Sequence, residues 1–140
     1  MDNIIVNTLE GTEVNLSDKY RGKSLLILFY NNKCLGCTGR ALPLAYKFSK
    51  EFKSVEVIAI HCNFTDEVVS KQDILDIFTE KTLPFQIYLD QGAKYFNYFQ
   101  CEGTPHWILI NNQGELYRSF FGSQDGAQNR LYFALTELAQ

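Results

Sequence analysis

The sequence lacks the features that mark membrane proteins and nucleic-acid-binding proteins. No stretch approaches the roughly 18 consecutive apolar residues that a membrane-spanning helix needs. The first residues, MDNIIVNTLEG, have neither the basic nor the apolar region of a signal peptide. Lysine and arginine do not cluster, and the formal net charge is −3, so we expect no nucleic acid and no membrane as partner. We therefore expect a soluble cytoplasmic protein, or a periplasmic or exported one if a leader precedes this sequence.

Internal repeats, low-complexity tracts and Pro/Gly/Ser-rich linkers are missing as well. The chain of 140 residues has the size of one domain, and its 46% hydrophobic content is enough for a core. We therefore expect residues 1–140 to form a single domain. A Gly-rich dinucleotide fingerprint is also absent, so we expect no cofactor.

Apolar runs separated by polar loops predict the strands. SLLILFY and VEVIAI are continuous apolar runs, typical of strands that are buried on both faces. Two short strands around Glu10-Gly11 predict an N-terminal β-hairpin, followed by the polar loop SDKYRGK. The predicted strands lie at residues 4–8, 12–16, 24–30, 55–60, in PFQIYLD, in HWILI and in ELYRSFF, with the turn NNQG joining the last two.

Helical spacing of apolar residues predicts a helix from Cys34 or Leu35 to Phe52, with a kink at Pro43. A second helix is expected near Val68 to Glu80, after the loop HCNFTD. Its inward-facing residues are predicted to be Ile74, Leu75, Ile77 and Phe78. A brief helix in AKYFNYF and a terminal amphipathic helix starting at Asp125 complete the pattern. Strands alternating with helices, then a hairpin and a helix, predict an α/β domain with a central mixed sheet.

Four cysteines, at positions 34, 37, 62 and 101, are too few and too unevenly spaced for a secreted disulfide scaffold. Cys34 and Cys37 stand in NNKCLGCTGR, where a central strand leads into a helix. A helix N-terminus favours the thiolate, so Cys34 is the predicted nucleophile. Cys37 lies one turn further along and is placed to resolve a mixed disulfide. Lys33 and Arg40 would lower the thiol pKa if their head groups point at the sulfur.

Two other interpretations of the cysteines stay open at this point. A zinc site needs two more ligands, yet Cys62 and Cys101 stand alone and no second C-x-x-C occurs, so no metal is expected. Two packed, inert thiols are the other alternative, although polar neighbours do not favour it. For Cys62 and Cys101 themselves, a buried inert thiol is favoured over a third thiol that joins the exchange.

Two segments together, GKSLLILFYNNKCLGC and CEGTPHWILINNQGEL, resemble the thioredoxin superfamily, in particular its TlpA and AhpC/TSA-like branch of bacterial thiol-disulfide oxidoreductases. The resemblance covers nearly the whole chain and implies a thioredoxin-like fold with an N-terminal extension. It implies catalytic roles for Cys34 and Cys37. It also implies a cis peptide bond before Pro105, facing the cysteines, and a Thr104 backbone that binds an extended substrate peptide. Without the resemblance, a trans turn at Thr104-Pro105 is the commoner conformation.

Several positions depart from the family pattern. The buried acid of thioredoxins maps to Leu28, which cannot carry a proton, and an aromatic residue before the first cysteine is replaced by Lys33. The proton donor is therefore left open. The Pro and Thr that peroxiredoxins place before their cysteine map to Ile27 and Asn31, which argues against a peroxide pocket.

His106 directly follows Pro105, and local hydrogen bonding is favoured for it over a role in tuning Cys34 or binding substrate. An aromatic group surrounds the Thr-Pro segment and is expected to be mostly core, with any exposed member forming a rim for a partner peptide. Its members are Tyr95, Phe96, Tyr98, Phe99 and Trp107.

The sequence thus predicts a thiol-disulfide oxidoreductase that reduces protein disulfides through Cys34 and Cys37. The expected partners are a disulfide-containing protein substrate and an electron donor, either a thioredoxin-reductase-like protein or a small thiol. The alternatives are a non-catalytic adaptor with a thioredoxin fold and a peroxiredoxin-like thiol peroxidase.

Overall fold

The computed structural model describes residues 3–66 and 68–140, and within them it contains seven strands and five α-helices. The strands are β1 (Ile5–Asn7), β2 (Glu13–Asn15), β3 (Ser24–Tyr30), β4 (Val55–Asn63), β5 (Gln86–Gln91), β6 (His106–Ile110) and β7 (Leu116–Phe121). The helices are α1 (Leu16–Lys19), α2 (Leu42–Glu51), α3 (Lys71–Leu75), α4 (Lys94–Tyr98) and α5 (Asp125–Leu138), with a π-helical turn, η1 (Cys37–Ala41), directly before α2.

The strands form one mixed sheet in the order β2-β1-β5-β4-β3-β6-β7. β3, β4 and β5 are parallel, because each is joined to the next by a crossover that contains a helix. β6 lies antiparallel to β3, and β7 returns beside β6 as a hairpin. The carboxyl end of β3 therefore lies next to the start of β6, which brings the C-x-x-C segment and the Thr-Pro segment to the same edge of the sheet.

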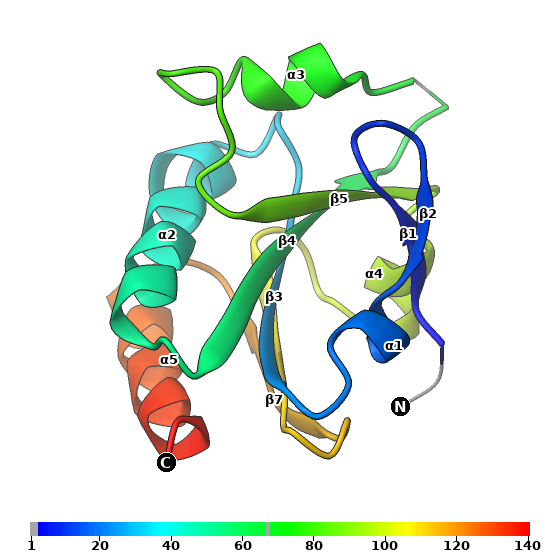
Figure 1. Ribbon diagram of the computed structural model, residues 1–140. Coiled ribbons are helices and arrows are strands. Elements are labelled where there is room, and N and C mark those ends of the chain that lie inside the picture. Colours follow the sequence, from blue (N-terminus) through cyan, green and yellow to red (C-terminus); the bar gives the residue numbers. More distant parts are fainter. Residues whose placement is uncertain (1–2, 67) are drawn as a thin grey trace.

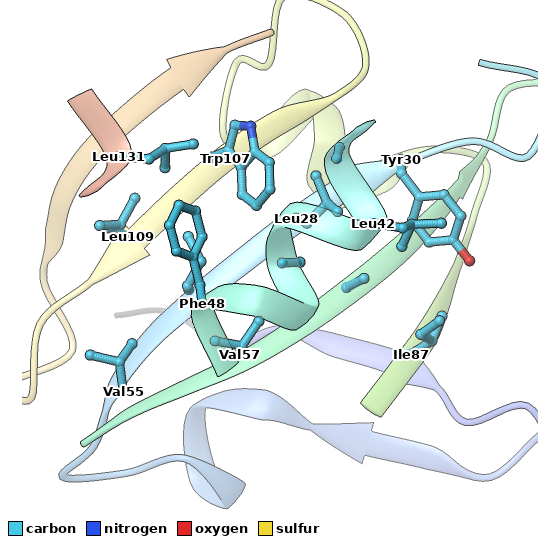
Figure 2. Packing of buried hydrophobic residues seen from close by; sticks show 14 of the residues in the cluster. Leu28, Tyr30, Leu42, Phe48, Val55, Val57, Ile87, Trp107, Leu109 and Leu131 are labelled. Atoms are coloured by element: carbon cyan, nitrogen blue, oxygen red, sulfur yellow. The ribbon is translucent and has the colours of Figure 1, made fainter. Parts of the chain in front are cut away.

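Side chains of β3 alternate between two hydrophobic clusters, one on each face of the sheet. Helices α2 and α5 cover one face, and α1 and α4 cover the other (Figure 1). We call these the α2/α5 cluster and the α1/α4 cluster. Figure 2 shows the α2/α5 cluster, in which Phe48 of α2 and Leu131 of α5 pack near Trp107 and Leu109 of β6. All seven residues of β3 are buried, as the continuous apolar run predicts.

Most of the predicted elements are confirmed. The N-terminal hairpin pairs Val6 with Val14, and HWILI forms β6 with the predicted bounds. The last hairpin and the C-terminal helix are also present. Two predicted loops are partly wrong. SDKYRGK begins inside the short helix α1, which Asn15 caps by accepting a hydrogen bond from the Ser17 N–H, and the first three residues of HCNFTD extend β4 to Asn63.

The predicted helix over residues 68–80 is wrong in length, because only Lys71–Leu75 is helical. A capping box between Ser70 and Asp73 starts it. Beyond Leu75 the N–H groups of Ile77 and Phe78 bond to carbonyls three residues back, which tightens the chain into turns. Among the predicted inward-facing residues Ile74 is buried, but Ile77 is exposed.

The predicted kink at Pro43 takes the form of a π-helical turn directly before it. Proline has no N–H and its ring crowds the carbonyl four residues back, so a regular helix does not pass through this position. The chain widens instead, and the N–H of Leu42 donates to the carbonyl of Cys37, five residues back.

Candidate active site

Cys34 occupies the N-cap of the helical segment that follows β3. Its carbonyl accepts hydrogen bonds from the N–H groups of Cys37 and Thr38, at 3.1 and 3.2 Å. Its Sγ accepts a further bond from the N–H of Cys37 at 3.3 Å, which is the position of an N-cap side chain toward the third helical residue. The sulfur is half-buried and bonded to a backbone donor that would stabilise negative charge.

Cys37 is buried beneath Cys34 in the α2/α5 cluster. Burial, together with hydrogen bonding to Cys34, raises the pKa of the Cys37 thiol to about 12. The Asn31 backbone and the Thr104 side chain donate toward this sulfur and lower the pKa in part. Cys37 is therefore a protonated thiol at neutral pH, and it must lose its proton before it attacks another sulfur.

The peptide bond between Thr104 and Pro105 is cis, as the resemblance implies. The thiol of Cys34 donates to the carbonyl of Thr104 at 3.3 Å. Pro105 lies against Gly36, where a Cβ atom would come within 3.7 Å of the proline ring. The structure thus brings together all four predicted site residues, Cys34, Cys37, Thr104 and Pro105, although they come from two separate segments of the chain.

One site residue was missed from the sequence. Ser123, directly after β7, donates its hydroxyl to the carbonyl of Gly36 at 3.4 Å, and its Oγ would lie 3.4 Å from a Cβ at position 36. Gly36 therefore lies between Ser123 and Pro105, and a Cβ there would be in van der Waals contact with both. No local sequence signal marks Ser123, because only the pairing of β7 with β6 brings it there.

The two cations beside the cysteines lie in different surroundings. The Arg40 guanidinium donates to the Gln124 side chain at 2.6 Å, in the segment that leads into α5. Lys33 lies on the wall of a cavity of about 440 Å³ beside the C-x-x-C segment. The cavity is also lined by Asn32, His61, Phe64 and Asp73.

The two remaining cysteines belong to the opposite face of the sheet. Cys62 is buried in the α1/α4 cluster, and Cys101 packs against the same cluster. Burial raises the pKa of Cys62, and it raises that of Cys101 to about 12. Both are therefore protonated at neutral pH. Cys62 is buried as expected, whereas Cys101 is only partly buried, and the inertness of both thiols stays a prediction.

The aromatic residues near the Thr-Pro segment are mostly core. Trp107, Tyr95 and Phe96 are buried, and Phe99 is partly buried. Tyr98 is exposed, but it lines a surface with Ile110, at the far end of β6 from Pro105. It therefore forms no rim for a peptide at Cys34.

His61, at the end of β4, is buried between the site and the cavity. Its Nε2 accepts a hydrogen bond from the Asn32 N–H at 3.2 Å, so the neutral ring carries its proton on Nδ1. That Nδ1 has no hydrogen-bond partner among the described residues. Burial lowers the pKa of His61 to about 4.

This buried histidine predicts a loss of stability in acid. The unfolded chain binds the proton near pH 6.5, whereas the folded chain binds it only near pH 4, so stabilisation is complete above pH 6.5 and is lost as the pH falls toward 4. We expect His61 to account for roughly 2 kcal/mol of the fall in unfolding free energy between pH 7 and pH 4.5. Urea unfolding at pH 7 and at pH 4.5 measures this fall in the unfolding free energy. His61→Gln retains an acceptor for Asn32 without titrating, and an equal fall in this variant would contradict the assignment.

Comparison with known proteins places the chain in a family. The model of the AhpC/TSA family matches residues 1–121. The chain belongs to this family. The resemblance seen in the two sequence segments is thereby confirmed, and it extends over both cysteines and the Thr-Pro segment of this AhpC/TSA-family protein.

Two relatives are similar along most of the chain. Thiol-disulfide oxidoreductase ResA of Halalkalibacterium halodurans is 30% identical over 122 residues, which are 86% of this chain and 65% of that protein. The chain thus spans just under two thirds of the length of this relative. Thioredoxin-like protein SkfH of Bacillus subtilis is 26% identical over 108 residues, covering 76% of this chain and 71% of that protein.

Solved structures agree with the fold. A thiol-disulfide isomerase from Corynebacterium glutamicum superposes with a TM-score of 0.81 at 21% identity, over 100% of this chain and 95% of that chain. The thioredoxin-like α/β fold predicted from the sequence is confirmed. Within residues 3–66 and 68–140, no helix is both long and apolar enough to cross a membrane. In the same residues, no three His, Cys, Asp or Glu side chains are grouped to hold a metal ion.

Proposed function

We propose that this protein is a thiol-disulfide oxidoreductase that reduces protein disulfides through Cys34 and Cys37. The observation that carries the proposal is the position of the Cys34 sulfur, 3.3 Å from the Cys37 N–H and 3.3 Å from the Thr104 carbonyl. The relative named thiol-disulfide oxidoreductase ResA supports the same activity. We further propose that residues 1–140 act as one domain.

In the proposed reaction, the Cys34 thiolate attacks one sulfur of the substrate disulfide. A bond forms between Cys34 and that sulfur, and the second substrate sulfur leaves as a thiolate. The Cys37 N–H stabilises the attacking thiolate through its hydrogen bond to Cys34 Sγ. The product of this step is a mixed disulfide.

Cys37 then attacks the Cys34 sulfur, which releases the first substrate sulfur and leaves a Cys34–Cys37 disulfide. Two electrons pass from the two protein thiols to the substrate disulfide. Because the Cys37 pKa lies near 12, this step requires removal of its proton, and the released substrate thiolate is a base available at the site. The side chain of Thr104 and the backbone of Asn31 donate toward the Cys37 sulfur and stabilise its ionised form.

The Thr-Pro segment is proposed to bind the substrate chain. The backbone of Thr104 would pair with an extended peptide in the manner of a β-strand, beside the sulfur that reacts. Pro105 has no N–H, so it places no competing backbone donor against the sulfurs. The partners are then a disulfide-containing protein and an electron donor, a thioredoxin-reductase-like protein or a small thiol. The cytoplasmic location stays a prediction.

Measurement of the reduction potential tests the proposed couple. The protein is equilibrated in a series of glutathione buffers and its free thiols are trapped. We expect a reversible two-electron transition that is lost in Cys34→Ser and in Cys37→Ser but kept in Cys62→Ser and Cys101→Ser. Absence of a Cys34–Cys37 disulfide at any buffer ratio would refute the proposal.

The mixed disulfide is tested separately with the Cys37→Ser variant. This variant retains the nucleophile but cannot release the substrate, so incubation with insulin is expected to give a covalent adduct that dithiothreitol cleaves. The double variant Cys34→Ser/Cys37→Ser is the matched control and should form none. An equal amount of adduct in the double variant would show that another thiol attacks.

A further inference from the structure

His106 begins β6, directly after the cis proline, and its ring is buried. Its Nδ1 accepts a hydrogen bond from the N–H of Glu102 at 3.4 Å, and its Nε2 lies 2.7 Å from the hydroxyl of Ser119 on β7. Because Nδ1 accepts from a backbone donor, the neutral ring carries its proton on Nε2 and donates it to Ser119. One side chain thus connects the loop before Pro105 to the neighbouring strand.

The loop that His106 holds is short and carries the Thr104 carbonyl. Between Glu102 and Thr104 stands only Gly103, where a Cβ atom would lie 2.8 Å from the ring of Phe121. On the other side of Pro105, its carbonyl accepts the N–H of Gly122 at 2.8 Å. The segment 102–105 is therefore held at one end by Gly122, directly after β7, and at the other end through His106 by Ser119 of β7. The hydrogen bond of Cys34 to Thr104 lies between these two attachments.

We propose that His106 is a positioning residue for the exchange reaction, which holds the Thr104 carbonyl against the Cys34 sulfur by linking the Glu102 amide to the Ser119 hydroxyl. The proposal rests on the proposed function of Cys34 and Cys37. His106 touches neither sulfur, so its effect passes through the loop. Without the link, Thr104 would orient Cys34 and an incoming peptide for a smaller fraction of the time.

This link is sensitive to acid. A protonated imidazole donates from both nitrogens, so Nδ1 and the Glu102 N–H would become two donors facing each other and their bond would be lost. Burial lowers the pKa of His106, and the Glu102 carboxylate on the same loop opposes this shift in part. From the neighbouring strands His106 faces Phe29 of β3, and Ser119 and Phe121 of β7, none of which carries a charge. The link is therefore intact at neutral pH and is lost in acid.

Two substitutions separate the parts of the link. His106→Leu removes both hydrogen bonds, and we expect it to lower the rate constant for insulin reduction by about tenfold at pH 8, the effect of one lost hydrogen bond. His106→Asn retains an acceptor where Nδ1 stands and does not titrate, so most of the rate should return. Ser49→Ala, at a partly buried serine on α2, is the matched control and should react as the unchanged protein does. Circular dichroism verifies that each variant is folded.

The pH profile distinguishes positioning from a merely structural role. The rate at each pH is expressed as the ratio of the unchanged protein to His106→Leu. We expect this ratio to fall from about tenfold at pH 8 toward one in acid. The hydrogen exchange of the Glu102 amide, followed by NMR, should be protected at pH 7 and unprotected in His106→Leu.

A ratio of one at pH 8, or a ratio that stays constant with pH, would overturn the positioning role. If the unchanged protein does not reduce insulin, the proposed function fails instead. In that case the hydrogen exchange of the Glu102 amide still tests whether His106 links Glu102 to Ser119, because this exchange does not depend on turnover. An unprotected Glu102 amide in the unchanged protein would refute the inference independently of any activity.

Discussion

Cys34→Ser is expected to slow insulin reduction by at least about a thousandfold, because a serine hydroxyl is not ionised at neutral pH and is a far weaker nucleophile toward sulfur than a thiolate. Its oxygen still accepts a hydrogen bond from the Cys37 N–H, as the sulfur does, so the N-cap and the fold should be retained. The measurement is the initial rate of insulin reduction with dithiothreitol as electron donor, together with circular dichroism.

Cys62→Ser is the matched control for this loss. Cys62 donates its thiol to the carbonyl of Ile60 at 3.7 Å within the α1/α4 cluster, and a serine there is similar in size and shape. We expect its rate to stay within a factor of two of the unchanged protein. If Cys34→Ser retained more than about a tenth of the rate, the nucleophile would lie elsewhere. Retained partner binding in the absence of any turnover by the unchanged protein would favour the adaptor interpretation.

Trp107→Ala is expected to lower the unfolding free energy by about 4 kcal/mol, a large part of the stability of a domain this size. The side chain is fully buried in the α2/α5 cluster and makes an edge contact with Phe48, with ring centroids 6.3 Å apart. Its Nε1 donates to the carbonyl of Gly122 at 2.8 Å. Removal of the ring would leave a cavity beside α2 and an unpaired carbonyl next to the Thr-Pro segment.

Urea unfolding followed by circular dichroism measures this loss, because Trp107 is the one tryptophan of the chain and its fluorescence disappears with it. Trp107→Phe keeps most of the packing but not the hydrogen bond, and we expect an intermediate loss of about 2 kcal/mol. Phe133→Ala removes an exposed aromatic ring from α5 and should cost less than about 0.5 kcal/mol. A loss for Phe133→Ala as large as that for Trp107→Ala would contradict the placement of the core.

The strands at the centre of the sheet are readable from the sequence because burial on both faces leaves few polar positions in them. SLLILFY and HWILI have this character, and both have the predicted bounds. The extension of β4 through His61 and Cys62 was not readable, since those residues are held in the strand by pairing with Leu89 and Asp90 of β5. The end of α3 at Leu75 was not predictable either, because apolar residues continue at helical spacing beyond the residue where the helix ends.

The candidate site also has residues that the sequence predicts and residues that it does not. Cys34 and Cys37 are neighbours in sequence, and Thr104-Pro105 was identified through its resemblance to a family segment. The partners of these residues were not predictable, because Ser123 and Ser119 reach the site only through the antiparallel pairing of β7 with β6. His106 was expected to be satisfied by local hydrogen bonds, and it is, but its bond to Ser119 crosses to another strand.

The sheet also separates the four thiols into two compartments of the molecule. Cys34 and Cys37 lie on the side of α2, whereas Cys62 and Cys101 lie on the side of α4. Under the proposed function the protein would handle disulfides at every turnover and would risk cross-linking itself, and the sheet stands between Cys34 and Cys37 on one side and Cys62 and Cys101 on the other. A disulfide between the two pairs would have to cross the sheet, so we expect Cys62 and Cys101 to be the two thiols that remain in an oxidised sample that has stayed native.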